Sequence, residues 1–221
     1  EHAENAGPAR AAPALTLNLT ESFMLKKLPL IGALLVALSA VEESAAAANP
    51  QVSIKTSAGE IVVELYPDKA PKTVENFLQY VRDDFYKGTI FHRVIGNFMI
   101  QGGGFTPDFY KGASGFGQKP TRAPIPLESK NGLRNDTGWI AMARTSDPNS
   151  ATAQFFINTV DNAGLNHPQP DGHGYAVFGK VVKGMDVVNA IRAVRTTRMG
   201  PFSDVPADPV TIDSVTLLGA K

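Results

Sequence analysis

Alternating apolar and polar positions predict that this chain is built mainly from short β-strands. In Glu60–Tyr66, which reads EIVVELY, the apolar residues Ile61, Val63 and Leu65 recur at every second position. A period of two is typical of a strand with one buried face. Because the apolar run Val52–Thr56 precedes it by only a short turn, the two runs are predicted to form a β-hairpin.

Two stretches change to the period of a helix. In Ala70–Tyr86 the apolar residues fall on one stripe, and Pro71 suits the first turn. This stripe contains Val74, Phe77, Leu78, Val81 and Phe85. We interpret it as a face that packs on the strands rather than a face that binds a partner. Gly184–Val194 is predicted to be a second, shorter helix.

Six further short runs are predicted strands, because each is apolar, aromatic or β-branched and is bounded by turn residues. They are Thr89–Ile95, Asn97–Gln101, Trp139–Ala143, Gln154–Asn158, Tyr175–Val182 and Val210–Leu218. Eight short strands and two helices, without a repeated strand–helix–strand rhythm, favour an antiparallel barrel or sandwich in one domain. The Gly- and Pro-rich stretch Gly102–Gly132 lacks the Lys-Ser/Thr pair and following helix of a phosphate-binding loop. We interpret its glycines as sharp turns around a cleft.

Residues 24–48 are predicted to be a secretory signal peptide. Lys26 and Lys27 precede the apolar run Leu28–Val41, which is followed by the small-residue tract Ser44–Ala48. The apolar run is shorter than the roughly 20 residues that span a bilayer. We therefore predict cleavage after Ala48, a periplasmic location and no remaining membrane anchor; an uncleaved anchor is the alternative. Residues 1–23 are interpreted as an upstream extension outside the mature protein, which leaves 49–221 as the functional domain.

Charge and composition exclude several classes of function. The formal net charge is zero and no run of Lys or Arg occurs, which disfavours nucleic acid and anionic membranes as partners. The chain has no cysteine, so thiol nucleophiles, disulfides and cysteine-bound metals are excluded.

The histidines and acids do not suggest a hydrolase or a metal enzyme. His92 adjoins Arg93 on a predicted strand, so the two side chains should point to opposite faces, His92 as a hydrogen-bonded structural residue. His167, Asp171 and His173 lack the helical spacing of a zinc site, and no metal is predicted. No G-x-S-x-G motif or close carboxylate pair is present.

The stretch Phe91–Phe105, FHRVIGNFMIQGGGF, places one guanidinium and one amide among apolar residues. Arginine is rarely buried without partners, because the loss of its hydration is costly. The stretch alone is consistent with a structural core arginine or with the polar group of an apolar pocket.

Three separated segments resemble the cyclophilin-type peptidyl-prolyl cis–trans isomerases. They are FHRVIGNFMIQGG from Phe91, MARTSDPNSATAQFFIN from Met142 and YAVFGKVVKGMDVV from Tyr175. The resemblance covers Val52–Leu218 and is nearest to the periplasmic bacterial members. It implies a mainly β fold, a closed eight-stranded antiparallel β-barrel capped by two α-helices. It also implies an enzyme without cofactor that acts on proline-containing polypeptides, including folding exported proteins, and we expect a monomer.

The resemblance further implies the site residues. Arg93 matches the family's catalytic arginine. The substrate-binding positions match Phe98, Met99, Gln101, Ala143, Arg144, Gln154, Phe156, Leu165 and Tyr175. Among these, Ala143 and Arg144 match the edge segment whose backbone pairs with the bound peptide.

Two positions depart from the better-known eukaryotic pattern. Gly164 replaces a tryptophan, which is expected to weaken binding of cyclosporin-like ligands, and Tyr175 replaces a histidine. Neither departure affects Arg93, so activity is expected to survive. The alternative function is a noncatalytic chaperone or proline-peptide docking module on the same barrel, which would not need Arg93.

Overall fold

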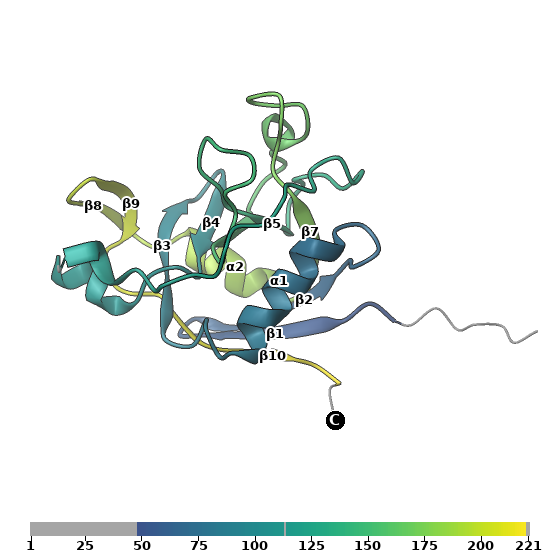
Figure 1. Cartoon of the computed structure of the whole chain (residues 1–221). Coiled ribbons are helices and arrows are strands. Elements are labelled where there is room, and N and C mark those ends of the chain that lie inside the picture. The colour runs from purple at the N-terminus through teal and green to yellow at the C-terminus, as the bar shows by residue number, and fades with distance from the viewer. Residues whose placement is uncertain (1–47, 113, 220–221) are drawn as a thin grey trace, which may run out of the picture. The chain divides into compact units, whose positions relative to one another are not determined.

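The computed structural model describes residues 48–112 and 114–219 (Figure 1). The predicted upstream extension and signal peptide lie outside these residues, except for Ala48. In the described part the barrel strands are β1 (Gln51–Thr56), β2 (Gly59–Leu65), β3 (Thr89–Ile95), β4 (Met99–Gly102), β5 (Trp139–Met142), β6 (Phe155–Asn158), β7 (Val177–Lys183) and β10 (Thr211–Leu217). They close in the order β1-β10-β3-β4-β6-β5-β7-β2, and every pairing is antiparallel. The predicted eight-stranded barrel is confirmed, and the sandwich is excluded.

The two predicted helices are α1 (Pro71–Arg82) and α2 (Met185–Arg192). Both contribute apolar residues to the same core as the barrel strands, so the packing role predicted for the stripe of α1 is confirmed. The helix is shorter than predicted because the chain turns after Arg82, and Asp84 adopts a positive φ of 55°. At the other end of α1, the Glu128 carboxylate accepts the backbone N–H groups of Lys72 (3.2 Å) and Thr73 (2.8 Å). It thereby satisfies N–H groups that lack partners within the helix.

The interior of the barrel is filled with side chains, so the site has to lie elsewhere. On β6, Phe155 and Ile157 belong to the main core, whereas Phe156 belongs to a separate cluster on the outer face. On β4, Ile100 points inward and Met99 points outward in the same way. The alternation of the strands therefore creates a second apolar surface on the outer wall of the barrel.

A β-bulge on β3 changes which residues reach this outer wall. Phe91 pairs with Gly102 and Arg93 pairs with Gln101, so two steps along β3 correspond to one step along β4. Bulges alter the direction in which side chains point and are frequent beside functional sites. Phe91 and Val94 both remain in the core, and Arg93 is directed to the outer wall beside Gln101. The prediction that His92 and Arg93 point to opposite faces assumed a regular strand, and the bulge between Phe91 and Arg93 interrupts that regularity.

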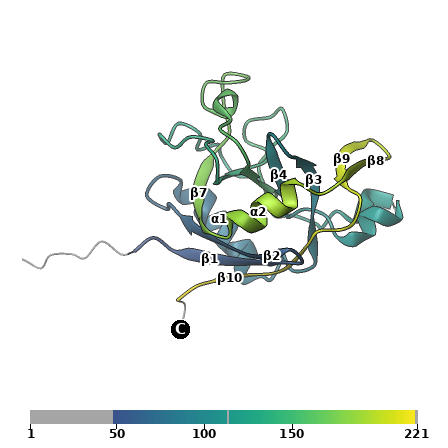
Figure 2. The same ribbon diagram turned by 180° about the vertical axis from the view of Figure 1, so that it is seen from behind.

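The Gly-rich stretch after β4 contains two short 3₁₀ helices, η1 (Pro107–Lys111) and η2 (Ser114–Gly117). Beside them lies a hairpin that the sequence pattern did not predict, β8 (Thr196–Met199) and β9 (Phe202–Pro206) (Figure 2). Phe202 packs against Phe109 and Phe116 at centroid distances of 4.9 and 5.0 Å. These contacts form a small aromatic cluster outside the barrel. Among the described residues, neither helix has the length and apolar composition needed to cross a membrane.

Candidate functional site

A pocket of about 190 Å³ lies on the outer face of β3, β4 and β6 and the segment after β5. It is lined by Arg93, Phe98, Met99, Gln101, Ala143, Arg144, Phe156, Leu165 and Tyr175. These are nine of the ten predicted site residues, and the tenth, Gln154, lines an adjoining cavity. The structure thus gathers residues from well-separated parts of the sequence around one concavity, and it favours a pocket over a core position for Arg93.

Arg93 is only partly buried, and among the described residues its guanidinium has no hydrogen-bond or ion-pair partner. Its neighbours in the pocket include Met99 and Phe156, which are 2% and 4% exposed. A permanently charged donor set is therefore held against an apolar surface without an internal acceptor. Such a group is available to a ligand.

Gln101 and Gln154 form the polar side of the pocket, where Gln101 Nε2 donates to Gln154 Oε1 at 3.0 Å. Gly104 permits this arrangement, because an added Cβ would lie 2.5 Å from Gln154 Cγ. The adjoining cavity of about 330 Å³ shares Gln101, Ala143 and Arg144 with the pocket, so the two form one continuous groove. Its other lining residues, Gln118, Thr121, Thr145, Ser150 and Thr152, were not predicted. Gln118 and Thr121 lie outside the three segments that carry the resemblance, and within the segment that begins at Met142 only Ala143, Arg144, Gln154 and Phe156 were assigned to the site.

The edge segment after β5 offers free backbone groups. The N–H of Ala143 already donates to the Gln154 carbonyl at 3.0 Å, so only its carbonyl is available for pairing. Among the described residues, the N–H and C=O of Arg144 have no hydrogen-bond partner. An extended peptide could pair with these groups as an added strand does.

Leu165 and Tyr175 form the far wall of the pocket. Leu165 ends the short 3₁₀ helix η3 (Ala163–Leu165), and its carbonyl accepts the Tyr175 N–H at 3.0 Å. The Tyr175 ring meets Phe156 edge-on at a centroid distance of 5.7 Å. No atom lies within 4 Å of a Cβ placed on Gly164, so this wall is open where the eukaryotic pattern has an indole.

The three histidines of the described residues, His92, His167 and His173, do not line this pocket. His92 is 4% exposed and packs against Phe105 in a tilted arrangement with 4.6 Å between ring centroids, which agrees with a structural role. The expected hydrogen bond is absent at Nδ1, which has no partner among the described residues, so aromatic packing holds the ring instead. His167 and His173 are exposed. Among residues 48–112 and 114–219, no three His, Asp or Glu side chains gather as a metal site would require.

Comparison with known proteins decides the family. The family model described as "Cyclophilin type peptidyl-prolyl cis-trans isomerase/CLD" matches residues 51–217. The chain belongs to the cyclophilins. Peptidyl-prolyl cis-trans isomerase cyp18 of Streptomyces antibioticus is 60% identical over 170 residues, covering 76% of this chain and 98% of that protein. Peptidyl-prolyl cis-trans isomerase B of Escherichia coli is 54% identical over 168 residues, covering 75% of this chain and 98% of that protein.

Solved structures agree with this assignment. A cyclophilin-type isomerase of Cryptosporidium parvum superposes with a TM-score of 0.62 at 27% identity, covering 78% of this chain and 99% of that chain. A second crystal structure of that protein, obtained in the presence of the dipeptide Ala-Pro, matches with the same TM-score at 28% identity. The predicted family, the bacterial relationship and the enzyme class, peptidyl-prolyl cis–trans isomerase, are confirmed. The roles of individual residues in this cyclophilin remain predictions.

Proposed function

We propose that this cyclophilin catalyses rotation about X–Pro bonds by using Arg93 to stabilise the twisted amide. Amide resonance gives the planar bond a rotational barrier of roughly 18–20 kcal/mol. Twisting the bond removes the resonance and localises a lone pair on the prolyl nitrogen. A donor that contacts this nitrogen stabilises the twisted state more than the planar state, and this difference lowers the barrier.

The observation that carries the proposal is the unpaired guanidinium of Arg93 against the apolar pocket. An arginine with a structural role would be expected to have internal acceptors, because desolvating it without them is unfavourable. Phe98, Met99, Phe156 and Leu165 offer a site for a pyrrolidine ring beside it. Low local polarity strengthens the interaction of the charge with a developing lone pair.

The substrate backbone would lie along the groove. The free N–H and C=O of Arg144 can pair with an extended peptide next to the proline, and Gln101 can contact the substrate amides from the other side. No nucleophile or proton transfer is needed for a rotation, so these interactions suffice. We propose that the enzyme binds one proline-containing segment in this way and acts as a monomer on polypeptides, not on nucleic acid.

Arg93→Ala tests the mechanism. Loss of one transition-state donor typically lowers kcat by about 10²–10³-fold, and we expect a decrease of this size in kcat/KM for a short X–Pro peptide. The melting temperature should change little, because Arg93 has no internal partner among the described residues. Arg82→Ala is the matched control, since Arg82 pairs with Glu75 on the surface, away from the pocket. Unchanged turnover would refute the proposed role of Arg93. The noncatalytic docking function instead predicts a wild-type protein without turnover, whose peptide binding is unaffected by Arg93→Ala.

We further propose that the enzyme is exported and assists the folding of periplasmic proteins. The order of Lys26 and Lys27, the apolar run and the small-residue tract supports export. An isomerase of Acinetobacter baylyi matches 87% of this chain at 51% identity, more than residues 49–221 alone could supply. The match therefore extends into the predicted leader. N-terminal sequencing of protein from a periplasmic fraction should begin at Asn49; an intact leader or a cytoplasmic product would refute export.

A further inference from the structure

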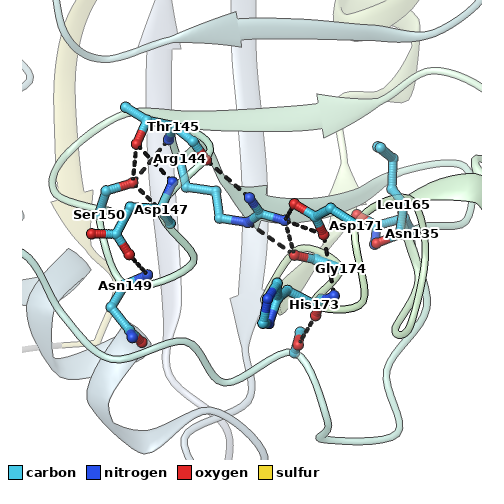
Figure 3. Close-up of polar contacts among 11 residues, drawn as sticks. Asn135, Arg144, Thr145, Asp147, Asn149, Ser150, Leu165, Asp171, His173 and Gly174 are labelled. Carbon is cyan, nitrogen blue, oxygen red and sulfur yellow. Dashed lines mark hydrogen bonds and ion pairs between the residues drawn. The ribbon is translucent and has the colours of Figure 1, made fainter.

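The second arginine of the pocket, Arg144, differs from Arg93 because its guanidinium is hydrogen-bonded within the protein. Its side chain is only 2% exposed, although its backbone lines the groove. Nη2 donates to both carboxylate oxygens of Asp171, at 2.9 and 2.7 Å, and Nε donates to the Gly174 carbonyl at 3.0 Å. Nη1 donates to the Thr145 carbonyl at 2.9 Å (Figure 3). The hydrogen-bonding edges of this guanidinium are thus occupied within the protein.

These contacts join two segments that are far apart in the sequence. Arg144 and Thr145 belong to the edge segment after β5, whereas Asp171 and Gly174 belong to the loop that leads into Tyr175 (Figure 3). The guanidinium lies over the Tyr175 ring, with 4.4 Å between Cζ and the ring centroid. A cation so placed is attracted to the ring, and more strongly when it is withdrawn from water.

Side chains from elsewhere in the domain hold the loop of residues 165–175 at three places, one of which is the Ser129 hydroxyl that donates to the His173 carbonyl. At one end, the Leu165 carbonyl accepts Asn135 Nδ2 at 3.2 Å, and Asn135 is fully buried. At the other end, Asp171, Gly174 and the Tyr175 ring are held by Arg144. Residues 166–175 include no helix or strand, so these side-chain contacts contribute much of what fixes the loop conformation.

We propose that Arg144 is a positioning residue that fixes the far wall of the proline pocket through Asp171 and Tyr175. In this role it sets the affinity for substrate and leaves the rate of rotation to Arg93. The guanidinium donors of Arg144 are directed at Asp171, Gly174 and Thr145, so they are not available to a prolyl nitrogen. Its charge is also balanced by Asp171, whose pKa is lowered chiefly by the hydrogen bond from Arg144. The inference rests on the proposed prolyl-isomerase function of the same pocket.

Arg144→Lys, Arg144→Gln and Asp171→Asn test the proposal, with KM and kcat measured separately by exchange NMR on an Ala-Pro peptide. Lysine keeps the charge but lacks the planar fork, so it should not rescue the wall. We expect KM to rise roughly tenfold for both Arg144 variants, the scale of one lost hydrogen bond between charged groups, while kcat stays within about twofold. Asp171→Asn should raise KM about threefold and should add nothing when combined with Arg144→Gln, because both changes disrupt one unit.

The control variant is Arg82→Gln, which disrupts an ion pair of Glu75 and Arg82 whose side chains are both 55% exposed and outside the pocket. Its KM should equal that of the wild type, and an equal rise there would refute the positioning role. A wild-type KM in Arg144→Lys would also refute it, as would a fall in kcat at constant KM. Asp171→Asn keeps the test valid if an Arg144 variant fails to fold.

Arg93→Ala, measured in parallel, separates this inference from the proposed function. Loss of turnover in Arg93→Ala together with an unchanged KM in the Arg144 variants refutes the positioning role alone. Unchanged turnover in Arg93→Ala refutes the proposed mechanism, whatever the Arg144 variants do.

Discussion

His92→Phe should make the domain less sensitive to acid than the wild type. His92 is 4% exposed among aromatic side chains, and its Nδ1 has no hydrogen-bond partner among the described residues. Burial lowers its pKa to about 4, with a further contribution from the positive charge of Arg93. The folded protein therefore favours the neutral imidazole.

The direction and size of the effect follow from this pKa. The unfolded chain takes up a proton near pH 6.5, the ordinary value, whereas the folded chain takes it up only near pH 4. Stability that is present above pH 6.5 is therefore lost as the pH falls towards 4, where the loss levels off. At 1.36 kcal/mol for each pKa unit, His92 costs the wild type about 3 kcal/mol in free energy of unfolding by pH 4. Phenylalanine cannot titrate and removes this cost.

Urea unfolding at pH 7, 6, 5 and 4, followed by circular dichroism, measures the effect. The difference in free energy of unfolding between wild type and His92→Phe should change by about 3 kcal/mol over this range. Any constant cost of repacking cancels in the comparison across pH. His173→Gln is the control, because the His173 side chain is exposed. A difference that stays the same from pH 7 to pH 4 would falsify the argument, since His92 would then not be held neutral by the fold.

Two further changes test the surroundings of the pocket. Gly104→Ala should push Gln154 away from Gln101 and break their hydrogen bond. Because one hydrogen bond is worth about 1 kcal/mol, kcat/KM in a protease-coupled assay should fall roughly fivefold. An unchanged kcat/KM would show that this amide pair is dispensable. Glu128→Ala should remove the acceptor at the start of α1 and lower the free energy of unfolding, measured in urea, by about 1 kcal/mol. Its kcat/KM should stay unchanged. A fall in kcat/KM would show that the α1 terminus is coupled to the site.

The barrel could be predicted from the sequence because its signals are local. Each of the eight barrel strands overlaps a predicted run, and Thr89–Ile95 has the predicted bounds. The hairpin of β8 and β9 was missed because Thr196, Thr197 and Arg198 are all exposed and show no alternation. The bulge at Phe91 was missed for a different reason. It depends on how β3 pairs with β4, and a pattern within one strand does not contain that information.

For the pocket, the residues could be predicted from the sequence, but their hydrogen bonds and ion pairs could not. The resemblance identified both Arg93 and Arg144 as pocket residues, and both line the groove. It could not show that one guanidinium is unpaired while the other is bonded to Asp171, 27 positions further along the chain. Pairings of this kind depend on loop conformation, for which Gly- and Pro-rich segments carry little periodic signal.

The location of the pocket on the outer wall determines which substrates can reach it. Because the barrel interior is filled, a chain cannot pass through it and must lie across the groove from the side. A prolyl bond in the middle of a long polypeptide is then as accessible as one near an end. Neither a free terminus nor an opening of the barrel is required, so exposed loops of partly folded proteins, and ring-closed peptides without ends, meet the same steric conditions as a short linear peptide.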